Sequence, residues 1–258
     1  MIEDIVRITC LAGDSILEIY RRPYSVDIKD DKSPLTEADL AAHTLIVDSL
    51  AKLTPEIPIV SEEMTEEEKA NNQGERFWLV DPLDGTKEFI KKTGEFTVNI
   101  ALIEDGIPIL GVVHTPAIQL TYWAEKGKGA FKKEGSNDPV AINCRKAQSD
   151  KLSVVASRDH AGPLVKSLLS TYPSAESSSM GSSLKFCMIA EGKADIYLRD
   201  VPTMEWDTAA AHCIVTESGG SITQLNQSPL IYNKPGLKNI SIVTIGDRDF
   251  PWQIPTPG

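Results

Sequence analysis

The chain has 258 residues, and its content of 41% hydrophobic and 24% charged residues is ordinary for a globular enzyme. Its formal net charge of −11 repels nucleic-acid backbones, which argues against a nucleic-acid partner. No apolar run approaches the roughly 20 residues that a membrane span requires, and the opening MIEDIVRITC lacks the regions of a signal peptide. The four cysteines form no C-x-x-C, which predicts thiols in a reducing compartment. We therefore expect a cytoplasmic location and no integral membrane segment.

The first part of the chain is predicted to form two helices. Apolar residues recur at helical spacing from Ile2 to Tyr20. After a polar segment with two prolines, a second helix is expected to run to about Leu53. Thr36 is its natural N-cap, and Asp39 supplies the acid of a capping box.

Two short apolar runs follow, and both lead into acidic residues. EIPIVSEE predicts a strand whose C-terminal end carries Glu62 and Glu63, and RFWLV predicts a strand with Asp81 at its tip. The polar segment MTEEEKANNQGE between them is expected to be a mobile loop. From Glu95 to about Lys132, β-branched and aromatic runs alternate with turn signals, which predicts an antiparallel meander.

After KKEGSNDP the pattern changes to alternating strands and helices. LSVVASR, ADIYLR and NISIVTIG predict strands, whereas GPLVKSLLSTY, SSLKFCMIAEG and DTAAAHCIVTESGG predict helices. We therefore expect two layered halves that combine α and β structure, residues 1–140 and 141–258, with an active-site cleft between them.

Several acids fall at the ends of predicted elements, where folds of this class expose functional groups. They are Glu62, Asp81, Asp84 and Asp207. Magnesium prefers oxygen ligands and is usually held by a few carboxylates together with phosphate and water. In LVDPLDGTKEF, Pro82 stiffens the turn between Asp81 and Asp84 and can leave the Leu83 carbonyl facing the same point. This corner can supply three oxygens to one or two ions.

Gly85 and Thr86 follow the corner and open the short helical segment KEFIKK. Backbone N–H groups at a helix N-terminus bind phosphate oxygens, and a glycine allows close approach of the phosphate to the backbone. Metal ions and the helix dipole would then converge on one anion. The motif is thus compatible with a metal-dependent phosphatase.

Each acid also has a purely structural interpretation. Asp84 and Asp207 could be helix N-caps, and Asp39 is satisfied by capping. Glu62 could be a surface acid. The turn lacks the D-x-D-x-T of phosphatases with an aspartate nucleophile and the D-x-D-x-D-G of a calcium loop. From the residues alone, both interpretations remain open.

Three motifs in order, SEE, WLVDPLDGTKEF and EWDTAA, resemble the inositol-monophosphatase-like superfamily of magnesium-dependent, lithium-sensitive phosphatases. SPLTEADLAAH, EFTVNIAL, GVVHTPA and GSSLKFCMIAEG are similar to its bacterial 3'(2'),5'-bisphosphate nucleotidases of CysQ type. The resemblance extends over nearly the whole chain. It implies a layered αβαβα sandwich of the inositol monophosphatase and fructose-1,6-bisphosphatase type.

The resemblance also implies roles for the matching residues. Two or three Mg²⁺ ions would be held by oxygen atoms of Glu62, Asp81, Leu83 (its carbonyl), Asp84 and Asp207. A water would attack the phosphorus in line, with its proton passed to Thr86 and Asp39 and its position set by Glu62. Gly85 and Thr86 would grip the scissile phosphate.

A nucleotide bisphosphate needs a second cationic pocket. SRDH places His160 after a predicted strand, and GSSLK places Gly181, Ser182 and Lys185 at a helix start. The resemblance implies that these residues contact the nucleotide. From the residues alone, Lys185 could be a solvated helix charge and His160 a loop residue. The substrate would also be touched by residues around the scissile phosphate: Glu62, Leu83, Asp84, Gly85, Thr86 and Asp207.

The reaction that the resemblance implies is removal of the 3'-phosphate from 3'-phosphoadenosine 5'-phosphate, which clears a by-product of sulfate assimilation. An inositol monophosphatase or broad sugar phosphatase is the second hypothesis. A catalytically silent nucleotide-binding or metal-binding protein is the third, and the complete set of matched acids argues against it. The resemblance is compatible with a monomer or a homodimer, and with a peripheral association with the cytoplasmic side of the inner membrane.

Overall fold

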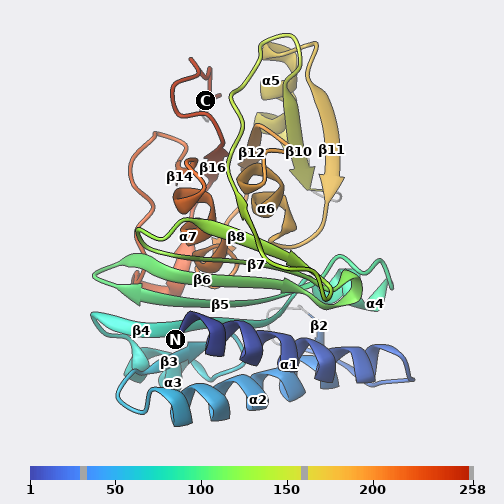
Figure 1. Ribbon diagram of the computed structural model, residues 1–258, viewed down its shortest axis with the longest axis vertical. Helices are drawn as coiled ribbons and strands as arrows, with labels where there is room; N and C mark the ends of the chain where they lie inside the picture. The colour runs from blue at the N-terminus through green and yellow to red at the C-terminus, as the bar shows by residue number, and fades with distance from the viewer. Residues whose placement is uncertain (30–33, 158–161, 256–258) are drawn as a thin grey trace.

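The computed structural model describes residues 1–29, 34–157 and 162–255. Its elements stack in five layers, in which helices separate two sheets and further helices cover the outer side of each sheet (Figure 1). The predicted αβαβα sandwich is therefore confirmed. Among the helices of the described ranges, none is long and apolar enough to cross a membrane.

Two long helices form the first layer: α1 (Ile2–Tyr20) and α2 (Glu37–Leu53). Both were predicted, and both bury apolar side chains against the larger sheet, including Ile5, Ile16 and Ile46. Two short antiparallel strands lie between these helices in the chain: β1 (Val26–Ile28) and β2 (Pro34–Thr36).

Helix α2 begins at the capping box that the sequence predicts. Thr36 Oγ1 accepts the N–H of Ala38 at 3.1 Å, and Asp39 Oδ2 accepts the N–H of Thr36 at 2.7 Å. The Thr36 hydroxyl also donates to Asp39 Oδ2 at 2.6 Å. One oxygen of Asp39 is thereby fixed, and the other is left for a different partner.

The second layer is a sheet in the order β3-β4-β5-β6-β7-β8-β9. Its strands are β3 (Ile59–Ser61), β4 (Arg76–Asp84), β5 (Thr97–Glu104), β6 (Ile107–Thr115), β7 (Leu120–Glu125), β8 (Ala130–Glu134) and β9 (Val140–Ile142). Within this sheet, whose residues 59–142 are all described, only β3 and β4 pair in parallel, so the predicted antiparallel meander is confirmed.

The segment between β3 and β4 is not the mobile loop that we predicted, because it forms helix α3 (Glu66–Asn72). Thr65 Oγ1 accepts the N–H of Glu68 at 3.2 Å, and the Glu68 carboxylate accepts the N–H of Thr65 at 2.8 Å. This T-x-x-E capping box nucleates a helix. Acids in its first turn are favourable beside the positive end of the helix dipole.

The middle layer contains α6 (Leu184–Ala190) and α7 (Ala209–Glu217), both predicted. Helix α7 lies against β5, β6 and β7 on one side and against the smaller sheet on the other. Its approach to β6 requires a glycine, because a Cβ at Gly111 would lie 2.2 Å from the Ala210 carbonyl oxygen. The third of the predicted helices in this half, α5 (Pro163–Thr171), covers the outer side of the smaller sheet (Figure 1).

The smaller sheet has the order β11-β10-β12-β16-β14. Its strands are β10 (Ser153–Ser157), β11 (Glu176–Met180), β12 (Ile196–Arg199), β14 (Ser221–Gln224) and β16 (Ile242–Ile245). The three predicted strands, β10, β12 and β16, are present. The edge strands β11 and β14 were not predicted, because ESSSM and SITQ lack an apolar run.

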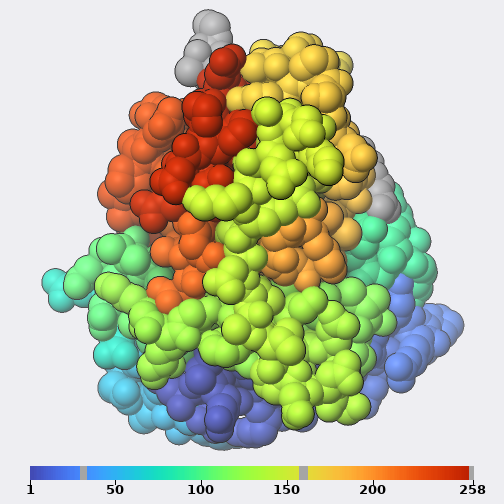
Figure 2. Space-filling model, turned by 45° about the horizontal axis from the view of Figure 1, so that its top comes forward, coloured from blue at the N-terminus to red at the C-terminus, as the bar shows by residue number. Residues whose placement is uncertain are grey.

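The predicted division near residue 140 falls at β9, the last strand of the larger sheet. The chain that follows β9, yellow-green in Figure 2, runs across this face of the molecule toward the smaller sheet. One apolar cluster nevertheless includes Phe77 of the larger sheet, Ile214 of α7 and Ile222 of the smaller sheet. A separation into two halves therefore stays a prediction.

Candidate active site

Strands β4 and β5 change register where the two acids of the D-x-x-D corner lie. Asp81 is paired with Asn99, and Asp84 with Thr97, so three steps along β4 match two steps along β5. Alternate residues of β5 face the same side, so this bulge turns both carboxylates to one side, whereas a regular strand would place them on opposite sides. We predicted that the strand would end with Asp81 at its tip. It instead contains the whole corner.

Asp207 brings a third carboxylate from the other end of the chain. One oxygen each of Asp81, Asp84 and Asp207 lies within 4.8 Å of the others. Ser183 Oγ lies 2.9 Å from Asp84 Oδ2 and 2.8 Å from the Asp207 carbonyl oxygen, and Asn99 Nδ2 donates to it at 3.0 Å. Ser183 and Asn99 thus fix the acids. Ser183 belongs to the GSSLK motif, but neither contact was predicted, because only the fold brings these residues to this point.

The interpretation of Asp84 and Asp207 as helix N-caps is wrong. Gly85, not Asp84, is the N-cap of helix α4 (Thr86–Ile90), and Thr208, not Asp207, is the N-cap of α7. The Asp207 carboxylate instead accepts the N–H of Met204 at 2.8 Å. Neither carboxylate is therefore used as a helix cap, and the hydrogen bonds described above involve one oxygen of each, Oδ2.

The pKa values of Asp81 and Asp207 lie well above the usual carboxylate range. Loss of hydration is the largest cause for both, and repulsion by Glu62 and Asp84 adds to it. Within the described ranges, neither Asp81 nor Asp207 takes part in an ion pair. A divalent cation with oxygen ligands would relieve this repulsion, so the donor set fits magnesium.

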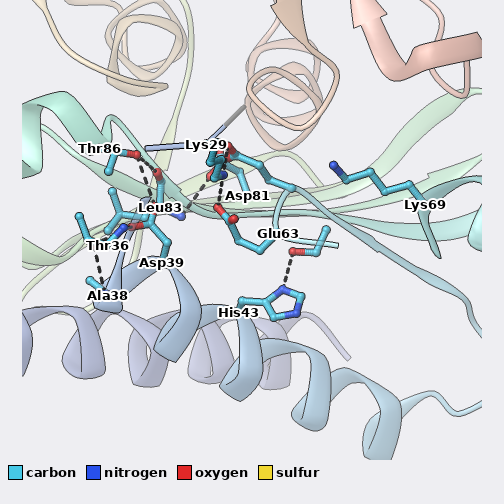
Figure 3. A network of polar contacts seen from close by, with 12 residues as sticks. Lys29, Thr36, Ala38, Asp39, His43, Glu63, Lys69, Asp81, Leu83 and Thr86 are labelled. Carbon is cyan, nitrogen blue, oxygen red and sulfur yellow. Dashed lines mark hydrogen bonds and ion pairs between the residues drawn. The ribbon is translucent and has the colours of Figure 1, made fainter. Parts of the chain in front are cut away.

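Glu62 approaches the three acids from the end of β3 but is paired with a lysine. Lys29 Nζ lies 3.0 Å from Glu62 Oε1 and 2.7 Å from Glu63 Oε1 (Figure 3). Burial alone would lower the pKa of Lys29, but the two carboxylates raise it above its usual value. Glu62 is not a fully exposed surface acid, and its charge acts on Asp81. Its role as a metal ligand stays a prediction.

The Thr86 hydroxyl faces two of the predicted partners. Its Oγ1 lies 3.4 Å from Asp39 Oδ1 and 3.4 Å from the Leu83 carbonyl oxygen (Figure 3). The pKa of Asp39 is raised, chiefly by burial, although hydrogen bonds from Thr36 oppose this. Asp39 therefore caps α2 with one oxygen and contacts Thr86 with the other, as the sequence predicts.

Two glycines allow the backbone to pack closely beside the acids. Gly85 has a φ of +92°, which favours glycine, and a Cβ there would lie 3.1 Å from the Glu95 carbonyl oxygen. At Gly181 a Cβ would lie 2.8 Å from the same oxygen. The Gly181 N–H donates to Glu95 Oε2 at 2.8 Å. Both predicted glycines thus lie at the rim of the same site.

A cavity opens directly beside Asp84 and Asp207, and the predicted Gly181, Ser182 and Lys185 line it. Lys185 is not a solvated helix charge, because only 6% of it is exposed. Burial lowers its pKa to about 8, against the attraction of Asp84. Its Nζ donates to the Ser182 carbonyl at 2.6 Å, and the buried Ser182 hydroxyl has no hydrogen-bond partner within the described ranges.

Sequence reasoning missed two further residues of this cavity, both from β12. Arg199 lines it, and its buried Nε lacks a partner among the described residues. Tyr197 packs edge-on against Phe186, with the ring centroids 5.1 Å apart, and burial raises its pKa to about 12. The signal was the position of Arg199 at the C-terminal end of a predicted strand. The predicted His160 lies outside the described residues.

The family profile described as "Inositol monophosphatase family" matches residues 4–241. The chain belongs to the inositol monophosphatase family. This family is generally magnesium-dependent, and the Asp81, Asp84 and Asp207 carboxylates form a group that could hold a metal.

The individual relatives are also similar over nearly their full length. The 3'(2'),5'-bisphosphate nucleotidase CysQ of Escherichia coli (strain K12) is 45% identical over 90% of this chain and 94% of its own. That of Aggregatibacter actinomycetemcomitans is 39% identical over 98% and 95%. The crystal structure of CysQ from Bacteroides thetaiotaomicron, described as a bacterial member of this family, superposes with a TM-score of 0.84 and 38% identity over 96% and 97%. The predicted membership of the CysQ-type group is confirmed.

Proposed function

We propose that the protein is a magnesium-dependent 3'(2'),5'-bisphosphate nucleotidase that removes the 3'-phosphate of 3'-phosphoadenosine 5'-phosphate, giving AMP and phosphate. The observation that carries this proposal is the place of Lys185, a buried cation in the same cavity as Asp84 and Asp207. One end of the cavity suits a phosphate bound through metal ions, and the other suits a second anion. The similarity to CysQ nucleotidases supports this assignment.

Asp81, Asp84 and Asp207 would hold Mg²⁺, together with the Leu83 carbonyl and Glu62, and we propose two or three ions. When bound, the ions neutralise the scissile phosphate and the charge that develops on the leaving oxygen. Ser183 would keep the Asp84 carboxylate and the Asp207 backbone together while the ions bind.

Thr86 and Asp39 would hold and move the proton of the attacking water. The Thr86 hydroxyl donates to Asp39 Oδ1, which leaves its oxygen lone pairs for the water. Asp39 cannot turn away, because Thr36 binds its other oxygen. Its raised pKa brings it closer to the range in which a carboxylate accepts a proton efficiently at neutral pH.

The second phosphate would bind Lys185, Arg199 and the Ser182 hydroxyl. Each brings polar atoms to the cavity, and Ser182 Oγ and Arg199 Nε are buried without partners among the described residues. An unpaired buried donor is unfavourable, so a phosphate that binds these groups gains more than it would at an exposed surface. The contact of His160 with the nucleotide remains a proposal from the resemblance.

An inositol monophosphatase or broad sugar phosphatase would use the same acids, Thr86 and Asp39, but would not need Lys185. Phosphate release from 3'-phosphoadenosine 5'-phosphate and from inositol 1-phosphate, each in Mg²⁺, separates the hypotheses. We expect kcat/KM for the nucleotide to be at least about tenfold higher, since a single buried ion contact is worth more than about 1.4 kcal/mol. Equal values would favour the broad phosphatase, and no release from either would favour a silent binding protein.

The biological role that follows is clearance of a by-product of sulfate assimilation. A cytoplasmic location, a peripheral association with the inner membrane, and the choice between monomer and homodimer remain predictions.

A further inference from the structure

Helix α3 has no role in the proposed chemistry. It contacts two segments that carry acids of the site: the end of β3 with Glu62, and the segment with Asp207. It begins shortly after Glu62 and Glu63, and at its other end Asn72 Nδ2 donates to the Ile59 carbonyl of β3 at 2.8 Å. Its Lys69 contacts the Asp207 segment, because Nζ lies 4.8 Å from the centroid of the Trp206 ring. Trp206 directly precedes Asp207.

Lys69 is an unusually buried lysine, with a side chain only 9% exposed. In Figure 3 it extends from one side toward the group around Asp81 and Glu63. Its ion pair with Glu66, at 2.9 Å, is weak, because the Glu66 side chain is 85% exposed. The Lys69 charge also acts on the Glu63 carboxylate. The face of Trp206 adds a contact that strengthens when both groups are removed from water.

The residue on the other side of Trp206 is anchored as well. Glu205 is fully buried and accepts the backbone N–H groups of Asn233 at 2.7 Å and of Lys234 at 3.0 Å. Asn233 Nδ2 in turn donates to the carbonyl of Gly74, which follows α3, at 3.1 Å. The α3 region thus contacts the Asp207 segment at two points, directly through Trp206 and indirectly through Glu205.

We propose that Lys69 is a positioning residue for magnesium: by packing on Trp206 it holds the Asp207 carboxylate beside Asp81 and Asp84. The proposal rests on the proposed function only in taking Asp207 as a metal ligand. The carboxylates must converge within about 0.5 Å of the productive geometry. A loosened Trp206 would displace Asp207, whereas Lys185 lies on another element and would keep its place.

The test uses Lys69→Met, which keeps the apolar stem and removes the charge, and Lys69→Arg, which keeps a cation for the ring. Mg²⁺ affinity is measured by isothermal titration calorimetry on the full chain after treatment with EDTA. We expect about a tenfold loss of affinity in Lys69→Met and less than about a twofold change in Lys69→Arg. Glu66→Gln, which removes only the exposed ion pair, should bind Mg²⁺ like the wild type.

A double-mutant cycle with Trp206→Leu separates this role from a general loss of stability. If Lys69 acts through the ring, Lys69→Met should cause no further loss of Mg²⁺ affinity in the Trp206→Leu background. The proposal is overturned if Lys69→Met binds Mg²⁺ like the wild type, or if its loss is the same with and without Trp206.

Kinetics add an independent readout and keep this proposal separable from the proposed function. The Mg²⁺ concentration for half-maximal phosphate release should rise about tenfold in Lys69→Met, with the nucleotide KM at saturating Mg²⁺ nearly unchanged. A higher nucleotide KM with an unchanged Mg²⁺ requirement would count against the proposal. If the wild type releases no phosphate from the nucleotide, the proposed function fails, while the calorimetric comparison still decides the role of Lys69.

Discussion

The carboxylates that suit the site for magnesium also destabilise the protein without it. The pKa of Asp207 is well above its usual value in the folded chain because of lost hydration and repulsion by Asp84 and Glu62. A raised carboxyl pKa means that the folded state binds the proton more tightly than the unfolded state. The ionised form therefore lowers stability as pH rises above the unfolded pKa of about 3.9, toward neutral pH.

Asp207→Asn removes this charge and can still accept the Met204 N–H. In EDTA at pH 7 we expect its Tm to exceed that of the wild type by about 2–4 °C, which corresponds to roughly 1 kcal/mol at this chain length. In Mg²⁺ the order should reverse, because the wild type gains a bound ion. Thermal unfolding with and without Mg²⁺ measures both. A lower Tm for the variant in EDTA would contradict the argument.

Lys185 supplies a pH dependence with a definite sign. Burial lowers its pKa to about 8 in the protein without substrate, and a bound phosphate must find the ammonium protonated. Above pH 8 each further pH unit should therefore raise the nucleotide KM about tenfold. Lys185→Arg should remove this dependence, since arginine stays charged. Inositol 1-phosphate, which lacks a second phosphate, is the control substrate, and an equal rise in its KM would exclude Lys185 as the cause.

At the scale of elements, local signals predicted much of the fold, and long-range pairing decided the rest. Apolar periodicity predicted α1 and α2, and turn signals predicted the meander from β5 to β8. The bulge in β4 could not be predicted, because it depends on the register with β5. Helix α3 was missed although its capping box was legible in Thr65 and Glu68. The polar composition of the segment indicated a loop, but the capping box allows a short helix to form there.

In the candidate site, too, some residues belong to a local motif, whereas others are brought in by long-range contacts. The sequence predicts the residues of one contiguous motif, from Asp81 to Thr86, because they share a local pattern. Ser183, Asn99 and Arg199 come from three separate elements, and only tertiary packing shows that they meet at Asp84 and Lys185. Their residue types are ordinary in strands and helices, so no local pattern distinguishes them.

The contact between α7 and β6 gives a prediction at this scale. A Cβ at Gly111 would lie 2.2 Å from the Ala210 carbonyl oxygen, so Gly111→Ala must push α7 away from the sheet. We expect a loss of about 3 kcal/mol in the free energy of unfolding by urea, together with weaker Mg²⁺ binding, because Asp207 directly precedes this helix. Gly74→Ala is the matched control, since no atom lies within 4 Å of its Cβ position. Equal stabilities of the two variants would contradict the packing argument.

At the scale of the whole molecule, the candidate metal site lies where the larger sheet meets the helix layer. Asp81 and Asp84 belong to the larger sheet, whereas Asp207 leads into the helix layer between the two sheets (Figure 1). Two histidines with little access to water lie near the contact between β6 and α7: His114 on β6 is buried and shares a hydrogen bond of 2.9 Å with Thr121, and His212 on α7 is half-buried. Burial lowers the pKa of each to about 4.

These histidines make the whole fold sensitive to mild acid. The unfolded state takes up the proton near pH 6.5 and the folded state only near pH 4, so their stabilising contribution is complete above pH 6.5 and is lost as pH falls toward 4. At pH 5 the loss is about 2 kcal/mol for each group.

The variant His114→Asn has no such pH dependence at this position, and Asn can keep the hydrogen bond to Thr121. Its deficit in unfolding free energy relative to the wild type should therefore shrink by about 2 kcal/mol between pH 7 and pH 5, as measured by urea denaturation in EDTA. The acidic site titrates equally in both proteins and cancels from this difference, so a deficit that stays constant with pH would show that His114 is not the buried neutral group described.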